Sequence, residues 1–118
     1  MAKFIKKNFD QPDQLKTPNK TYDALVNLGS VTVIKTIRKP GWRWSECVGS
    51  VVGKEICQAS HIGIVISGSL TVVSDDGEEM TVSDGDAYSI APGHDGWVLG
   101  NENFVAFEFD SPDSKRQM

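Results

Sequence analysis

Hydrophobic and polar residues alternate along most of this chain in short runs, which are rich in β-branched and aromatic side chains. Glycine, proline, aspartate and asparagine separate the runs, and Asp76-Gly77 is a typical hairpin turn. No stretch shows a convincing helical spacing of apolar residues. The pattern predicts an all-β sandwich or barrel with nine strands, at Tyr22 to Leu28, Val31 to Arg38, Trp42 to Cys47, His61 to Ser67, Leu70 to Ser74, Glu79 to Val82, Ala87 to Ile90, Trp97 to Leu99 and Phe104 to Phe109.

The predicted strand from His61 to Ser67 has two different faces, because alternate side chains of a strand point to opposite sides. One face carries His61 with small neighbours, which is typical of a pocket wall. The other face carries Ile62, Ile64 and Ile66. Three adjacent isoleucines need a cover, either from another layer of this chain or from a second subunit. We expect a homodimer that covers this face.

The length of 118 residues and the mass of 12.9 kDa indicate one domain. We expect an N-terminal arm or edge segment at residues 1–21, because few apolar residues and two prolines occur there. The barrel is expected at residues 22–110. Residues 111–118 are predicted to form a flexible tail.

Composition and charge exclude several functional classes. A hydrophobic fraction of 39% and a charged fraction of 24% are typical of a soluble globular protein. The net charge of -4 argues against a nucleic-acid partner or an anionic membrane surface, which both require clustered lysine and arginine. Only two cysteines are present, with no signal peptide and no apolar run of about 20 residues. We therefore expect a cytoplasmic protein with no membrane partner.

Four side chains set the limit on transition-metal chemistry: His61, His94, Cys47 and Cys57. Imidazole and thiolate are good ligands for zinc, iron, nickel or copper. The spacing of these residues matches no standard zinc module, so a structural interpretation stays open. In that interpretation the two thiols are buried for packing, one histidine is capped by backbone groups and the other lies in a loop.

Other kinds of catalytic site find little support in the sequence. It contains no Gly-x-Ser-x-Gly elbow for nucleophilic catalysis and no glycine-rich phosphate-binding motif. Four aromatic residues are candidates for the wall of a ligand pocket, although large aromatic side chains also serve as core anchors. They are Trp42, Trp44, Tyr88 and Trp97.

From Gly41 onward, the order of motifs resembles the cupin superfamily. Gly41 and Cys47 reproduce the spacing of the first glycine and histidine of the first cupin motif, and His61 and Gly68 reproduce the spacing of its glutamate and second glycine. The stretch at residues 85–93 resembles the second cupin motif, a Gly-Asp strand that ends in a Pro-x-Gly turn, and His94 follows directly after it. Together with the Trp-x-Trp-Ser-Glu stretch, these motifs are similar to a bacterial subgroup of small single-domain cupins.

The resemblance implies a double-stranded β-helix, or jelly-roll, barrel over roughly residues 22–110. Typical metal cupins use three histidines and a glutamate, whereas this chain offers Cys47, Cys57, His61 and His94, with Glu55 as a further carboxylate. The resemblance therefore implies a divalent transition metal such as zinc, iron or nickel, but a barrel that has lost its metal fits equally well.

Three functional hypotheses follow, and the sequence leaves them open. In the first, a metal-binding cupin acts on a small organic substrate in the barrel. In the second, a metal-free binding or sensor module holds a metabolite with the same histidines and no catalysis. In the third, Cys47 and Cys57 form a disulfide or a redox pair. The sequence does not decide whether the protein is an enzyme.

Overall fold

The structure is a computed structural model that describes residues 3–110. These residues form nine strands and two short helices: β1 (Gln14–Lys16), β2 (Thr21–Asn27), β3 (Thr32–Arg38), α1 (Trp44–Cys47), α2 (Gly49–Val52), β4 (His61–Ser67), β5 (Ser69–Ser74), β6 (Glu79–Val82), β7 (Ala87–Ile90), β8 (His94–Leu99) and β9 (Phe104–Asp110). The predicted all-β class is confirmed. The predicted tail at residues 111–118 lies outside the described residues.

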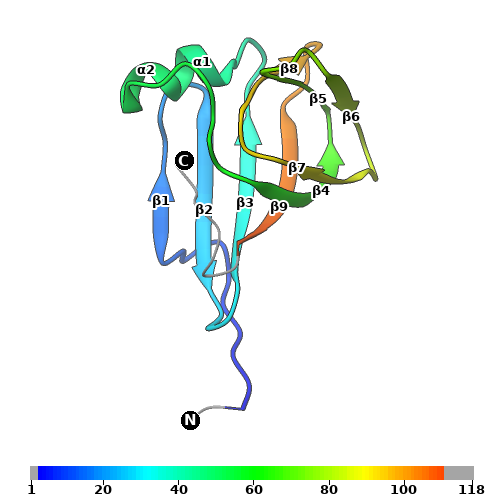
Figure 1. The fold of residues 1–118 in the computed structure, drawn as a ribbon. Helices are drawn as coiled ribbons and strands as arrows, with labels where there is room; N and C mark the ends of the chain where they lie inside the picture. The colour runs from blue at the N-terminus through cyan, green and yellow to red at the C-terminus, as the bar shows by residue number, and fades with distance from the viewer. Residues whose placement is uncertain (1–2, 111–118) are drawn as a thin grey trace.

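The strands form two antiparallel sheets. The larger sheet has the order β1-β2-β3-β9-β4-β7, and the smaller one has the order β6-β5-β8. In Figure 1 the small sheet curves over the β9, β4 and β7 end of the large sheet, so that the two sheets face each other, while α1 and α2 lie at one end. The strands of the large sheet that lie away from this closed part, β1 and β2, extend beyond it.

A single residue, Gly68, carries the chain from the large sheet to the small one, because β4 ends at Ser67 and β5 begins at Ser69. Its φ of 84° lies in the left-handed region. A Cβ atom at this position would lie 2.3 Å from the carbonyl oxygen of Asn103. Only glycine fits this crossing from one sheet to the other.

The strand predicted at Trp42 to Cys47 is wrong, because its last four residues, Trp44–Cys47, form helix α1. Trp44, Cys47 and Val48 are all buried, at a spacing of three and four residues that brings side chains to one side of a helix. The Asp95 carboxylate favours this helix by accepting bonds from the Ser45 backbone N–H (3.0 Å) and from Arg43 Nε (3.0 Å). The expectation that no stretch is helical fails here for that reason.

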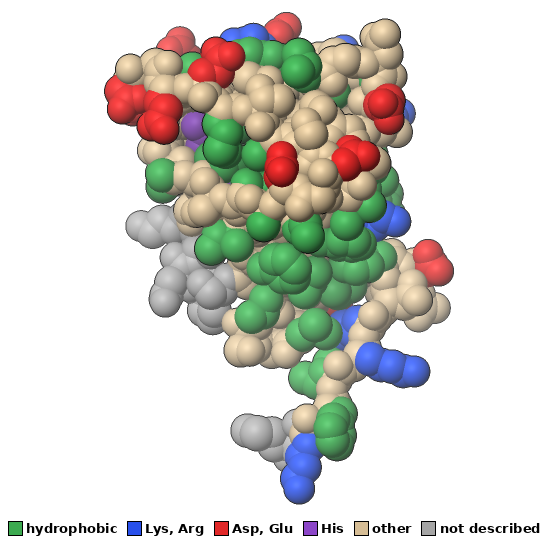
Figure 2. Space-filling view, turned by 90° about the vertical axis from the view of Figure 1, so that its right-hand side faces the viewer, with side chains coloured by type: hydrophobic (Ala, Val, Ile, Leu, Met, Phe, Trp, Pro, Cys, Tyr) green, Lys and Arg blue, Asp and Glu red, His purple; other side chains and the backbone are tan. Residues whose placement is uncertain are grey.

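The inner faces of the sheets form the core. Fifteen buried apolar residues form one cluster that includes Trp42, Trp44, Val65 and Phe104. The outer face of β4 is different, since Ile62, Ile64 and Ile66 are 59%, 39% and 49% exposed. The predicted alternation of β4 is therefore observed, with the histidine face inside. Figure 2 shows hydrophobic side chains gathered on the corresponding side of the molecule.

The N-terminal segment runs beside the large sheet. Strand β1 adds an edge to it by pairing with β2, and the Phe9 ring lies 5.5 Å from the ring of Phe107 on β9. Among the described residues, no helix has the length and apolar character needed to cross a membrane.

Candidate metal centre

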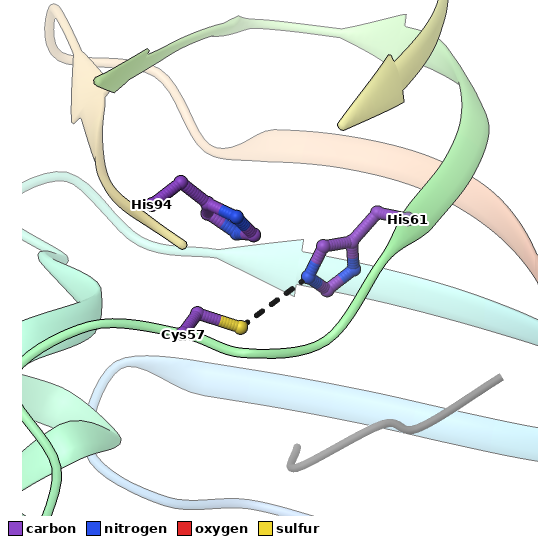
Figure 3. Close-up of side chains that lie close together, drawn as sticks. All are labelled: Cys57, His61 and His94. Carbon is purple, nitrogen blue, oxygen red and sulfur yellow. Dashed lines mark hydrogen bonds between the residues drawn. The ribbon is translucent and has the colours of Figure 1, made fainter. Parts of the chain in front are cut away.

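Three of the four predicted metal ligands converge inside the barrel: Cys57, His61 and His94 (Figure 3). Their ligand atoms all lie within 4.8 Å of one another, and all three residues are buried. His61 is the first residue of β4 and His94 is the first residue of β8, so the two sheets each supply one imidazole. Cys57 lies in the loop that precedes β4.

Backbone hydrogen bonds hold the Cys57 loop against the start of β8. The Cys57 N–H donates to the His94 carbonyl (2.7 Å), and the Gly93 N–H donates to the Cys57 carbonyl (2.8 Å). His61 is fixed separately, because it pairs with Ile90 in the β4–β7 ladder. The position of each ligand therefore follows from main-chain pairing.

Both imidazole rings are oriented by a bond at Nδ1. His61 Nδ1 lies 3.0 Å from Glu108 Oε1, and His94 Nδ1 donates to the Ala91 carbonyl oxygen at 2.8 Å. Glu108 is in turn held by the Tyr88 hydroxyl, which donates to its Oε2 at 2.5 Å. Each ring therefore presents Nε2 to other partners. Metal-ligating histidines in proteins show the same arrangement, with a carboxylate or a carbonyl on the second nitrogen.

The site shifts the pKa of the Cys57 thiol. Burial acts to raise its pKa, but hydrogen bonds from His61 and His94 outweigh burial and lower the pKa from 9.0 to about 6. At neutral pH the site therefore favours a thiolate, which is the form that binds metals.

One ligand pair of the cluster has the spacing of a tetrahedral zinc site, and the three ligand atoms all lie within 4.8 Å of one another. Cys57 Sγ lies 3.6 Å from His61 Nε2. With zinc bonds of about 2.3 Å to sulfur and about 2.0 Å to nitrogen, a sulfur and a nitrogen ligand in tetrahedral positions lie about 3.5 Å apart. The donor set of one thiolate and two imidazoles suits zinc, and the rings are oriented by carboxylate and carbonyl partners.

The remaining two candidate ligands lie elsewhere. Cys47 is buried in α1 and belongs to the hydrophobic core, outside the cluster that the described residues form. Its backbone N–H donates to the Arg43 carbonyl within the first helical turn. Both cysteines are free, so the structure does not contain the disulfide considered above. Glu55 is exposed.

A cavity of about 40 Å³ lies inside the barrel and is lined by His61, His94 and mostly apolar side chains. Of the four predicted pocket aromatics, Trp42 and Trp44 line this cavity. Tyr88 is outside this lining, and its hydroxyl donates to the Glu108 carboxylate beside His61. Trp97 lies outside, with the Arg43 guanidinium 4.7 Å from its ring.

A second, wider pocket of about 230 Å³ adjoins the cavity. The two share three wall residues, Val72, Ile90 and His94. Glu78 and Glu79 line only the outer pocket. His94 therefore lies, with Val72 and Ile90, where the inner cavity adjoins the outer pocket.

Sequence reasoning missed Glu108, the carboxylate that orients His61. The sequence does indicate that Glu108 points into the core, because Phe104, Ala106 and Glu108 occupy alternate positions of one strand, and the first two are apolar. An acid on the inward face of such a strand is buried, and a buried acid needs partners. The partner could not be read from the sequence, because His61 and Glu108 are 47 residues apart.

Comparisons with known proteins identify the fold. No protein-family model and no curated protein sequence matches the chain. Solved structures do match, among them a sugar phosphate isomerase of the cupin superfamily from Silicibacter pomeroyi. It is 16% identical, with a TM-score of 0.63, and the match covers 91% of this chain and 75% of that one.

Two further neighbours are enzymes with other chemistry. The polyketide cyclase RemF from Streptomyces resistomycificus is 14% identical, with a TM-score of 0.63 over 98% of this chain and 86% of its own. The oxalate decarboxylase of Lactobacillus farciminis, in its formate complex, is 13% identical, with a TM-score of 0.68 over 96% of this chain. This chain spans about a third of that decarboxylase, the match covering 34% of it.

At these identities the neighbours establish architecture, and activity has to be argued from the site. Their fold agrees with the two antiparallel sheets described above. The chain has the fold of a small cupin domain, a double-stranded β-helix barrel of the jelly-roll type.

Proposed function

We propose that this protein binds a divalent transition metal, zinc in the first place, through Cys57, His61 and His94, and uses it to hold and polarise a small organic ligand inside the barrel. The observation that carries the proposal is the convergence of one thiol and two oriented imidazoles on a buried point beside a cavity. Three protein ligands are typical of catalytic zinc sites, whereas structural sites use four.

The surrounding residues each have a role in this site. Glu108 orients His61 and increases the basicity of its ring, and Tyr88 holds Glu108 in place. The apolar walls exclude water, which strengthens every electrostatic interaction within. A metal ion bound here supplies a Lewis acid for a carbonyl or hydroxyl oxygen. The fold neighbours include an isomerase, a cyclase and a decarboxylase, so the fold leaves the reaction type open.

Elemental analysis of purified, tag-free protein tests the metal site. After incubation with zinc and removal of the excess, we expect about one zinc ion per chain, by the ligand count above. Cys57→Ser and His61→Ala should lose it. Cys47→Ser is the matched control, because it makes the same substitution in the other buried cysteine. Equal zinc content in Cys57→Ser and Cys47→Ser would overturn the assignment.

The second candidate function is a metal-free binding or sensor module. Its specific support is the continuous chain of contacts from Tyr88 through Glu108 and His61 to Cys57, which connects buried polar groups to one another. In this function His61 and His94 hold a metabolite by hydrogen bonds. A metal-free parent protein that is stabilised by a metabolite, and is unaffected by zinc, nickel or iron, would select this candidate.

We also propose that the protein is a homodimer through the outer face of β4. Ile62, Ile64 and Ile66 are exposed there, and Phe109 on the neighbouring strand β9 is 42% exposed. Contiguous apolar surface of this kind marks an interaction site in a soluble protein. The Phe9 contact with Phe107 covers only part of the sheet.

A further inference from the structure

Arg38 brings a positive charge to the wall of the inner cavity. It is the last residue of β3, it lines the cavity, and only 6% of it is exposed. Its guanidinium donates to both carboxylate oxygens of Asp23, at 2.6 and 3.3 Å, and its Cζ lies 5.0 Å from the centre of the Trp42 ring. The aspartate and the tryptophan hold the guanidinium in one orientation, and nothing in the proposed metal site uses it.

One edge of this guanidinium is unbonded among the described residues. A guanidinium carries five N–H groups. Three of them are used, because Nη1 and Nη2 each donate to Asp23 and Nη1 also donates to the Ile37 carbonyl at 3.4 Å. The other two, on Nε and Nη2, share one edge of the planar group, which we call the free edge. Two parallel N–H groups of this kind match the two oxygens of a carboxylate.

The free edge is accessible, whereas Asp23 is not. Among the described residues, Trp44 Nε1 is the side-chain nitrogen that is both buried and unbonded, so the unbonded Nε of Arg38 retains accessible surface. The Arg38 side chain is 7% exposed, against 1% for that of Asp23. Arg38 lines the cavity and Asp23 is not part of its wall. A ligand in the cavity therefore meets the positive group first, with the negative group behind it.

The other charges around the cavity leave a place for one anion. Glu108 also lines it, but its two oxygens are engaged by His61 Nδ1 and by the Tyr88 hydroxyl. A zinc ion in the proposed site keeps one positive charge after its thiolate ligand is counted. A carboxylate in the cavity offsets that charge and accepts charge-assisted hydrogen bonds from Arg38.

The volume and the walls limit the ligand to a small acid. A water molecule needs about 10–15 Å³ of such space, so the cavity of about 40 Å³ holds the equivalent of about three waters. Leu70, Val72 and Phe104 make its walls largely apolar. Glu78 and Glu79 line the adjoining outer pocket, where they disfavour a second negative charge on the ligand. The space therefore suits a monocarboxylate with a short carbon chain.

We propose that the inner cavity binds a small monocarboxylate, such as a hydroxy or keto acid, with its carboxylate on the free edge of Arg38. The inference rests on the proposed function, because it assigns a ligand class to the same barrel interior. Asp23 and Trp42 are positioning residues, which hold the guanidinium for the ligand. The hydroxyl or carbonyl oxygen of the acid lies toward the three metal ligands.

NMR of the arginine Nε–H groups in isotopically labelled protein tests the proposal directly, at constant ionic strength. The probes are acetate and glycolate, with acetamide as the neutral molecule of the same shape as acetate. Acetate and glycolate should shift the Arg38 signal saturably, and acetamide should leave it in place. Arg43 Nε already donates to Asp95 at 3.0 Å, so its signal should stay in place throughout. An unmoved Arg38 signal, an equal response to acetamide or an equal response at Arg43 would each overturn the proposal.

Matched variants measure what the free edge contributes to affinity. Arg38→Lys keeps a positive charge beside Asp23 but has no planar fork, and it should bind acetate about ten-fold more weakly, the effect of one lost charge-assisted hydrogen bond. Arg43→Lys is the control, because Arg43 also pairs with an aspartate and lies over a tryptophan but is outside the cavity lining. Equal affinities in the two variants would contradict the assignment. If Arg38→Lys does not fold, the NMR titration of the parent protein decides alone.

The titrations are done on metal-free and on zinc-treated protein, so that the two proposals fail separately. An Arg38 shift with acetate in protein that fails to take up zinc would refute the metal site and support the carboxylate subsite. Zinc uptake with an Arg38 signal that acetate and glycolate leave in place would refute the carboxylate subsite and support the metal site.

Discussion

Replacing Glu108 by glutamine should weaken zinc binding without disturbing the fold. The side chain keeps its size, and the amide can still accept from His61 Nδ1 through its oxygen while its NH₂ group donates to the Tyr88 oxygen. The two contacts of 3.0 and 2.5 Å can therefore persist with donor and acceptor exchanged on the tyrosine side. Only the negative charge on the far side of the His61 ring is lost.

The size of the effect follows from the role of such partners. Removing the carboxylate behind a ligating histidine costs about 10- to 100-fold in metal affinity, or roughly 1.4–2.7 kcal/mol. We expect the zinc dissociation constant of Glu108→Gln to rise by this factor at neutral pH. Tyr88→Phe should show a smaller rise, because it removes only the bond that positions Glu108.

Competition with a chromophoric zinc chelator measures the dissociation constants, and circular dichroism confirms that the variants are folded. Glu55→Gln is the matched control, since it makes the same substitution in an exposed glutamate outside the cluster. Parent-like affinity in Glu108→Gln, or an equal loss in Glu55→Gln, would show that the carboxylate does not support a metal ligand.

Three further predictions concern the proposed dimer interface on β4, the ionisation of the Cys57 thiol and the close approach of β9 to β4 at Gly63. Ile64→Lys should convert the homodimer to a monomer in light scattering, and a parent protein that is already monomeric would contradict the interface. In metal-free protein the ultraviolet absorbance of the Cys57 thiolate should titrate with a midpoint near pH 6 and disappear in Cys57→Ser but not in Cys47→Ser. Because the folded pKa lies below the ordinary value of 9.0, the stability from this thiolate is complete above pH 9 and is lost as the pH falls through 6, which urea denaturation across this window measures. Gly63→Ala places a Cβ atom 2.6 Å from the Phe107 carbonyl oxygen and should cost about 1–3 kcal/mol of unfolding free energy; unchanged stability would contradict the tight packing of β4 on β9.

Local pattern was enough to predict most strands. The bounds of β4, β6 and β7 agree residue for residue with the prediction, because alternation and turn residues are properties of neighbouring positions. Helix α1 was not predicted, because it spans a single turn and depends on the Asp95 side chain. Asp95 is 50 residues away from Ser45 in the chain. A helix of this length has too few residues to show a period.

The candidate site was predictable in its residue types but not in its grouping. His61 and His94 were recognised as candidates because imidazole is rare in this chain and lies within both cupin-like motifs. In the sequence Cys47 takes the place of the first-motif histidine, whereas the structure brings Cys57 to the two histidines through the pairing of its loop with β8. The register of β9 against β4 places Glu108 in the site, and no local sequence pattern specifies that register.

The place of β9 in the large sheet bears on how the protein is made. It is the last described strand along the chain, yet it lies between β3 and β4 and pairs with both. During synthesis on the ribosome, β3 and β4 therefore emerge with unpaired edges that wait for β9. Until it arrives, neither the barrel nor the carboxylate behind His61 is in place. A chain that stops before Phe104 would expose two open strand edges to other nascent chains, so translation must run past the entire barrel before the site exists at all.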